Sequence, residues 1–294
     1  TTNTIRIIAA TALSLFVVIY VSAQIDITGK TFESFLGFNY YTGIAIGFGI
    51  VVLYIFSGGF LAVAWSDFFQ GSLMAVGLLL LPLVAYFSLS DSVSIVEGLN
   101  SIDPGLLDIW GSGGLTLMNA LSILGLISIG IGFMGSPQVY VRFIAIESEA
   151  EVDKGKWVAV WYTLLTDTAA VLIGIIGRYM LTQFGDNPEA ILGNAAENVL
   201  ALVLDQVMPT IIIGVYIAAV LSAVMSTVDS LLVVASSAVT RDFYQQIINP
   251  NVSQDKLMAL SKKVTLILAV LALGVALSVS VLSPTRTVFW FVIF

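Results

Sequence analysis

Residues 210–235 read TIIIGVYIAAVLSAVMSTVDSLLVVA. Asp229 carries the only charged side chain in this stretch, and the stretch is longer than the roughly 20 residues that a helix needs to cross the hydrocarbon core of a bilayer. It therefore predicts a membrane-spanning helix, over about 208–240, with a carboxylate inside it. Other long apolar runs occur along the rest of the chain.

Composition places the whole chain in the membrane class. Of its 294 residues, 58% are hydrophobic and 10% are charged, whereas a soluble domain carries about 25% charged residues. A hydropathy scan predicts seven complete spans and the start of an eighth, at 5–28, 42–63, 67–90, 116–146, 157–182, 208–240, 262–282 and 288–294. The expected fold is an all-α membrane protein with 1–294 forming a single transmembrane domain. Because the chain starts at Thr1 and stops at Phe294 inside an apolar run, we expect it to be incomplete at both ends.

Lys and Arg residues predict the orientation of the spans. With the N-terminal end inside, eight of these residues lie on the inner side and three on the outer side. This distribution follows the positive-inside bias, so segments 91–115 and 183–207 are expected outside. The second and third spans are expected to join through residues 57–59 and a tight turn at 64–67.

The chain contains no Cys and no His. Disulfides, thiolate chemistry and the usual zinc ligands are therefore excluded, and the commonest general base is absent. No basic patch indicates nucleic acid. We expect neither an enzyme nor a cofactor-binding protein.

Acidic residues within the spans point to a structural or functional role, because the insertion of a carboxylate at the centre of a spanning helix costs at least about 2.5–3.5 kcal/mol. Asp67, Asp167 and Asp229 are such residues. Asp167 is expected to be a buried packing residue, hydrogen-bonded to Thr163, Thr166 or a neighbouring helix. For Asp26, near the outer end of the first span, a wetted helix end is as good an interpretation as a functional one.

The 208–240 span has a polar face. At about 100° per residue, one side of the helix carries Ser222, Ser226, Asp229, Ser230, Ser236 and Ser237, with Thr227 at its margin. Hydroxyls in membrane helices often bond back to carbonyls of the preceding turn or join helices. The alternative is a dehydrated site for a hard cation, which needs several oxygen ligands and partial charge neutralisation. Asp229 favours this alternative.

The 116–146 span contains the sequence GIGFMGSP at 130–137. Proline removes a backbone donor and clashes with the preceding turn, while glycine lowers the cost of unwinding. The pattern predicts a helix unwound around 130–135 that faces a cavity, or a plain proline kink.

Three motifs resemble the sodium/solute symporter family, and within it the bacterial sodium/proline symporters. The first is GGFLAVAWSD at 58–67, followed by Gln70 and Ser72-Leu-Met. The second is GSPQ at 135–138 with Val141-Arg-Phe. The third combines AVMST at 223–227 with SSAVTRD at 236–242. They occur in the family's order with similar spacing.

The resemblance implies a LeuT-like inverted-repeat core of five plus five helices in the plasma membrane. This chain would hold core helices three to nine and the start of the tenth. It also implies a main sodium site formed by the carbonyl of Ala223 and the hydroxyls of Ser226 and Thr227. A second cation position maps onto Asp67, Ser226, Asp229 and Ser230, and many members have a small hydroxyl residue where Asp229 stands.

For the solute, Tyr20 matches a tyrosine that proline carriers place near their substrate. The Trp and Tyr that those carriers use on the broken helix are Ile129 and Phe133 here. This departure implies a less aromatic pocket.

The resemblance implies sodium-coupled symport of a small organic solute, such as proline or a related amino acid, with Na⁺ as the coupling ion and the lipid bilayer as surroundings. The alternative is a symporter-like sensory module of a signalling protein. A channel and an intramembrane enzyme fit the residues less well, and the oligomeric state is open.

Overall fold

The computed structural model describes residues 2–55, 60–89, 94–111, 114–283 and 287. Within these residues the regular secondary structure is entirely helical. The chain divides into two compact units, the first made of Thr1–Met74 with Tyr216–Phe294 and the second of Ala75–Val215.

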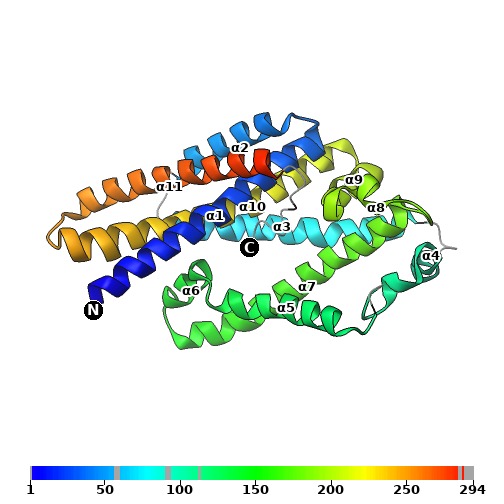
Figure 1. Ribbon diagram of the computed structural model, residues 1–294, viewed down its shortest axis with the longest axis horizontal. Helices are drawn as coiled ribbons and strands as arrows, with labels where there is room; N and C mark the ends of the chain where they lie inside the picture. Colours follow the sequence, from blue (N-terminus) through cyan, green and yellow to red (C-terminus); the bar gives the residue numbers. More distant parts are fainter. Residues whose placement is uncertain (1, 56–59, 90–93, 112–113, 284–286, 288–294) are drawn as a thin grey trace. The chain divides into compact units, whose positions relative to one another are not determined.

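The first unit is built around helix α1 (Thr2–Leu36). It contacts α2 (Tyr40–Ile55), α11 (Gln254–Leu282) and the π-helix η3 (Ala238–Ile248). The start of α3 (Phe60–Ser88) and most of α10 (Thr210–Ser237) complete the unit (Figure 1).

Four of these helices share an apolar core. Small and branched side chains fill it, which suits helices that pack closely. The buried members are Val17, Val21 and Ile25 of α1; Ile44 and Val51 of α2; Val224, Val228, Leu231, Leu232 and Ala235 of α10; and Leu268, Ala269, Ala272 and Ala276 of α11.

The hairpin of α1 and α2 depends on two glycines. Gly37 follows the last residue of α1 with φ +65°, and its N–H donates to the carbonyl of Glu33 at 3.0 Å, which ends the helix. On α2, a Cβ added to Gly47 would lie 2.0 Å from Cγ2 of Thr28. Any side chain at Gly47 would therefore force the two helices apart.

Helix α10 changes its winding at its end. From Ala238 the chain continues as η3, a π-helix, in which backbone bonds run between residues i and i+5. Thr240 is buried there and donates its hydroxyl proton to the carbonyl of Ser236 at 2.7 Å. The hydroxyls of Ser236 and Ser261 are 3.2 Å apart, which links α10 to α11.

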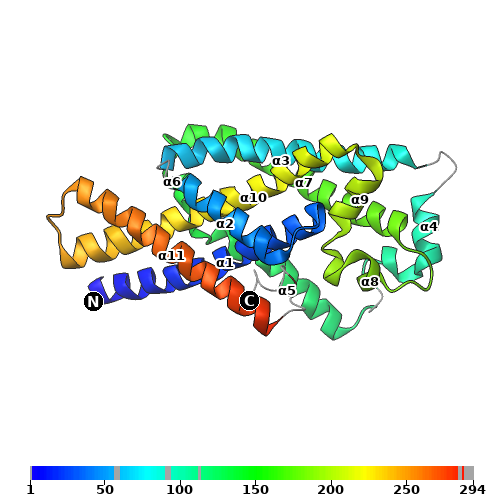
Figure 2. The ribbon, with the colours of Figure 1, turned by 90° about the horizontal axis from the view of Figure 1, so that it is seen from above.

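The second unit includes the long helix α7 (Glu149–Leu181), which contacts α4 (Ile95–Ile102) and α9 (Val199–Val207) (Figure 2). The short helices η1 (Pro104–Leu107), α8 (Pro188–Leu192) and η2 (Asn194–Ala196) lie in the two segments that were expected outside. Ser94 caps α4 by accepting from the N–H of Glu97. The orientation itself stays a prediction.

Six of the described helical segments are long and apolar enough to cross a membrane. They are Asn3–Leu36, Val63–Ser88, Leu117–Ile144, Glu149–Leu181, Thr210–Ile248 and Gln254–Leu282, with Tyr40–Leu53 as a shorter apolar helix. Most extend beyond the predicted boundaries. The predicted 42–63 span runs through 56–59, and the predicted eighth span, 288–294, lies wholly outside the described residues.

The expected turn at 64–67 is wrong, because α3 runs unbroken from Phe60. Those four residues include neither Gly nor Pro, and the hydroxyl of Ser66 bonds back to the carbonyl of Val63 at 2.8 Å. Asp67 therefore lies in the second turn of a helix rather than at its start.

The break in the fourth span is real but is displaced. Helix α5 (Leu117–Met134) stays helical through Gly130 and Gly132, and α6 (Pro137–Ile144) begins directly at the proline. Gly135 and Ser136 form the break, with Ser136 extended at φ −67° and ψ 120°. Pro137 disfavours helical geometry in the residue before it, whereas glycine only makes unwinding cheaper. The predicted unwinding over 130–134 is therefore wrong.

Candidate cation site

The oxygen-rich part of the first unit lies on α10 between Ala223 and Ser230. The hydroxyl of Ser226 donates to the carbonyl of Ala223 at 2.9 Å, and the hydroxyl of Thr227 approaches the same carbonyl at 3.1 Å. The predicted back-bonding is thus present. The same two contacts also gather three neutral oxygens around one point within a single turn of helix.

One turn further on, the hydroxyl of Ser230 lies among three oxygens. It is 2.7 Å from the carbonyl of Ser226, 3.3 Å from Oδ1 of Asp229 and 3.5 Å from Oδ2 of Asp67. A hydroxyl carries one proton, so it cannot donate well to all three acceptors. The short contact to Ser226 is the hydrogen bond, and the two carboxylates are close oxygen neighbours.

Two members of this second group are buried, and Asp67 is half-buried. Asp229 is 1% exposed and Ser230 is 5% exposed. Two carboxylates that lie near one hydroxyl repel each other, and burial increases that cost. A hard monovalent cation between them would gain anionic and neutral oxygen ligands and would relieve the repulsion. The structure thus places five of the six predicted cation-site residues on α10 between Ala223 and Ser230, and it brings the sixth, Asp67 of α3, close to Ser230.

The three predicted solute residues are divided between the units. Tyr20 is half-buried on α1 and packs against the apolar core of the first unit. Ile129 and Phe133 lie one turn apart on α5 in the second unit, and Phe133 is exposed. A shared solute pocket stays a prediction.

Asp167 does not lie where it was expected. Its side chain is exposed on α7, while Thr166 beside it is buried and donates to the carbonyls of Tyr162 and Thr163 at 2.8 and 3.2 Å. The buried face of α7 carries Thr166, Ala169, Ile173 and Ile176, and Asp167 points away from that face. The prediction of a buried, hydrogen-bonded acid is wrong.

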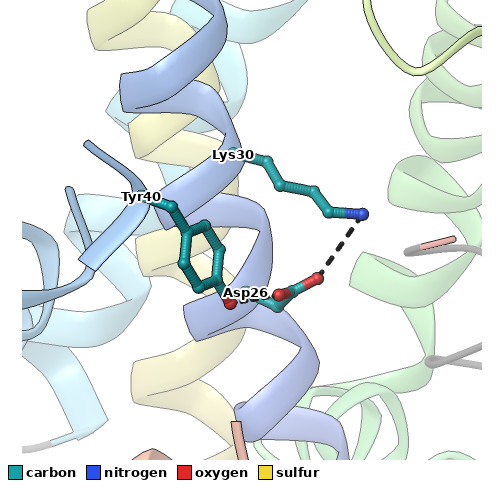
Figure 3. Close-up of polar contacts among 3 residues, drawn as sticks. All are labelled: Asp26, Lys30 and Tyr40. Carbon is teal, nitrogen blue, oxygen red and sulfur yellow. Dashed lines mark hydrogen bonds and ion pairs between the residues drawn. The ribbon is translucent and has the colours of Figure 1, made fainter. Parts of the chain in front are cut away.

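Asp26 is the polar site that the sequence left undecided. Its side chain is completely buried, so the wetted-end interpretation is wrong. Tyr40 donates a hydrogen bond to it, and Lys30 forms an ion pair with it (Figure 3). The spacing of Asp26 and Lys30, four residues apart on one helix, was the available sequence signal.

Known transporters resemble this chain over most of its length. The sequence profile of the sodium:solute symporter family matches residues 1–294. The high-affinity proline transporter PutP of Bacillus subtilis is 34% identical over 284 residues, covering 94% of this chain and 56% of the transporter. The sodium/proline symporter of Escherichia coli is 30% identical over 279 residues, covering 92% and 53%. This chain therefore spans about half the length of the curated relatives it matches.

A solved structure of a Na⁺-coupled sialic acid symporter, substrate-bound and outward-open, has a similar fold. The TM-score is 0.72 at 21% identity, covering 94% of this chain and 58% of that one. This likeness confirms the predicted all-α, LeuT-like fold, although it does not test the number of spans. The relatives are transporters rather than enzymes. Together with the six long apolar helices found among the described residues, this similarity indicates that the chain is part of a multi-pass plasma-membrane protein.

Proposed function

Because the chain belongs to the sodium:solute symporter family, we propose that the protein couples the entry of Na⁺ to the uptake of a small organic solute. Proline or a related amino acid is the expected substrate, since PutP of B. subtilis and its E. coli relative are named for proline. The lipid bilayer is the expected surroundings of its long apolar helices.

The oxygen cluster on α10 is the observation that supports this proposal most directly. The carbonyl of Ala223 with the hydroxyls of Ser226 and Thr227 offers neutral ligands of the kind that Na⁺ accepts. When Na⁺ enters, the two hydroxyls turn their lone pairs toward the ion and release the carbonyl of Ala223 to it. The back-bonds seen here would then be the resting arrangement of this main position.

The second cation position would work through charge. Asp67 and Asp229 carry carboxylates on either side of Ser230, and Asp229 is almost completely buried. An ion bound there would reduce the repulsion between the two carboxylates, which raises the free energy of the protein when no ion is bound. Binding at this position therefore favours whichever conformation keeps α3 and α10 together.

The solute is proposed more broadly than proline itself. Ile129 and Phe133 stand where proline carriers are expected to have Trp and Tyr, so the pocket offers less aromatic surface. A related amino acid or another small organic solute of similar size fits this change. Tyr20 on α1 would supply the remaining aromatic contact.

The test is solute uptake by the full-length protein in proteoliposomes. A panel of radiolabelled amino acids and related compounds is offered with an inward Na⁺ gradient, and the control is an equal K⁺ gradient. At least one solute should accumulate above its outside concentration with Na⁺ alone. Accumulation that is the same with both ions, or absent for every solute, would contradict the proposal.

A further inference from the structure

A second charged cluster lies on α1 near the hairpin, and it shares no residue with the oxygen cluster of α10 described above. Asp26 has an exposed fraction of 0%, and its carboxylate contacts Lys30 of its own helix and Tyr40 of α2 (Figure 3). A buried carboxylate without a counter-charge is strongly destabilising. The side chains around Asp26 must therefore supply that charge.

The two oxygens of Asp26 have different neighbours. Oδ1 accepts a hydrogen bond from the hydroxyl of Tyr40, the first residue of α2. Oδ2 lies 3.7 Å from Nζ of Lys30, one turn further along α1. The Lys30 side chain is 25% exposed, so its ammonium group reaches the carboxylate from a partly open side.

The Lys30 contact has the character of a counter-ion contact. A charge-assisted N–H···O bond is typically about 2.7–2.9 Å long, and 3.7 Å is well beyond that length. The ammonium thus supplies charge to Oδ2 without close bonding. A carboxylate oriented by a hydroxyl and balanced by a nearby monovalent cation has the composition of a small cation site.

We infer that the carboxylate of Asp26 is a monovalent-cation site whose resident ion is the protein's own Lys30 ammonium group. Tyr40 orients the carboxylate and ties the start of α2 to α1. Because the cation is tethered, the site is filled whether Na⁺ is present or absent. The cluster holds the hairpin closed independently of the ions at α10.

This inference predicts how the protein responds when the Lys30 side chain is removed. In Lys30→Ala, Asp26 stays buried and loses the ammonium charge of Lys30, which a small alkylammonium ion or Na⁺ can replace. The melting temperature of the full-length protein in detergent should fall by roughly 6–15 °C, since removing the counter-charge beside a buried carboxylate is costly. Addition of n-propylammonium chloride or NaCl should restore a large part of this loss. Choline chloride, at the same concentration and too bulky for the site, should not.

A double variant separates the charge from the shape of the side chain. Asp26→Asn with Lys30→Ala removes the site, so its melting temperature should exceed that of Lys30→Ala and should not respond to n-propylammonium. If Lys30→Ala fails to fold, recovery of folded protein in the double variant supports the inference. Equal failure of the double variant overturns it.

Lys154→Ala is the matched control. Lys154 also pairs with a carboxylate on its own helix, that of Glu151 at 2.7 Å, but both side chains are largely exposed. Its loss should leave the melting temperature unchanged. A Lys30→Ala protein as stable as wild type, or one that all three salts stabilise equally, would overturn the inference. Because the readout is thermal stability, failure here leaves sodium-coupled uptake untouched.

Discussion

The carboxylate of Asp67 on α3 lies 3.5 Å from the hydroxyl of Ser230 on α10, although 163 positions separate the two residues in the chain. The second cation position proposed above would therefore draw on two helices. The proposed main position, around the carbonyl of Ala223, would lie within one turn of α10. The two positions should respond differently to substitution.

Neutralising an acid should weaken Na⁺ binding. In Asp67→Asn and Asp229→Asn the cation loses an anionic ligand, and interactions with charged groups contribute about 1.5–3 kcal/mol. The Na⁺ concentration for half-maximal uptake should rise roughly tenfold to a hundredfold, or the number of Na⁺ ions per solute should fall. Solute affinity at saturating Na⁺ should change less. Unchanged Na⁺ dependence and stoichiometry in both variants would contradict the second position.

Removing a hydroxyl from the main position should have a smaller effect. Ser226→Ala and Thr227→Ala each delete one neutral oxygen, with a cost of about 0.5–1.5 kcal/mol. The half-saturating Na⁺ concentration in uptake assays should rise roughly twofold to tenfold. Ser278→Ala is the control, because its hydroxyl also bonds back within a helix, to Gly274 at 2.7 Å, but is exposed on α11. A shift in Ser278→Ala equal to the others would point to a general effect on folding.

Asp167 should prove dispensable for Na⁺ binding. Its side chain is exposed on α7, so Asp167→Asn removes no buried contact. Stability should stay within about 0.5 kcal/mol of wild type, and the Na⁺ titration of uptake should be unchanged. A tenfold loss of Na⁺ affinity in the folded variant would make it a coupling residue after all.

Ile129 should influence which solute is accepted. If Ile129 and Phe133 shape the pocket, Ile129→Trp restores an aromatic group where proline carriers are expected to have one. The order in which unlabelled solutes inhibit uptake should then change, while the half-saturating Na⁺ concentration should not. A variant that keeps both properties would place Ile129 outside the pocket.

Single cysteines can test the orientation, since the natural chain has none. Ser94→Cys should react with an impermeant maleimide added outside intact cells, and Lys154→Cys should react only after the cells are opened. Both residues are exposed at the ends of their helices, so access should not limit labelling. The reverse pattern would invert the topology.

The class of the fold and the grouping of polar side chains on one face of α10 could be predicted from the sequence, because both depend on local patterns. Long apolar runs determine spans, and the spacing of Ser226, Asp229 and Ser230 determines which groups share a face of α10. The oxygen contacts found there follow directly from that spacing.

Other predictions failed where tertiary packing or a single backbone group decides the outcome. Asp167 and Asp26 both lie in predicted spans of the sequence, yet Asp167 is exposed and Asp26 is fully buried. Hydropathy cannot separate them, because the difference depends on which neighbouring helix covers each face. The break before Pro137 lies a few residues later than the glycines indicate, because glycine permits unwinding whereas proline enforces it.

The π-helix after α10 determines where the chain tolerates a change in length. A π-helix holds more residues per turn than an α-helix. Segment η3 can therefore lose a residue and still remain helical, whereas α10 cannot do so without a change in the direction of its side chains. Deleting Val239 would tighten the winding of η3 and, because Val239 follows Ser230 in the chain, would leave the oxygen cluster of α10 in place. Deleting Val224 would instead rotate Ser226, Asp229 and Ser230 by about 100° relative to the preceding part of α10, away from Asp67 on α3.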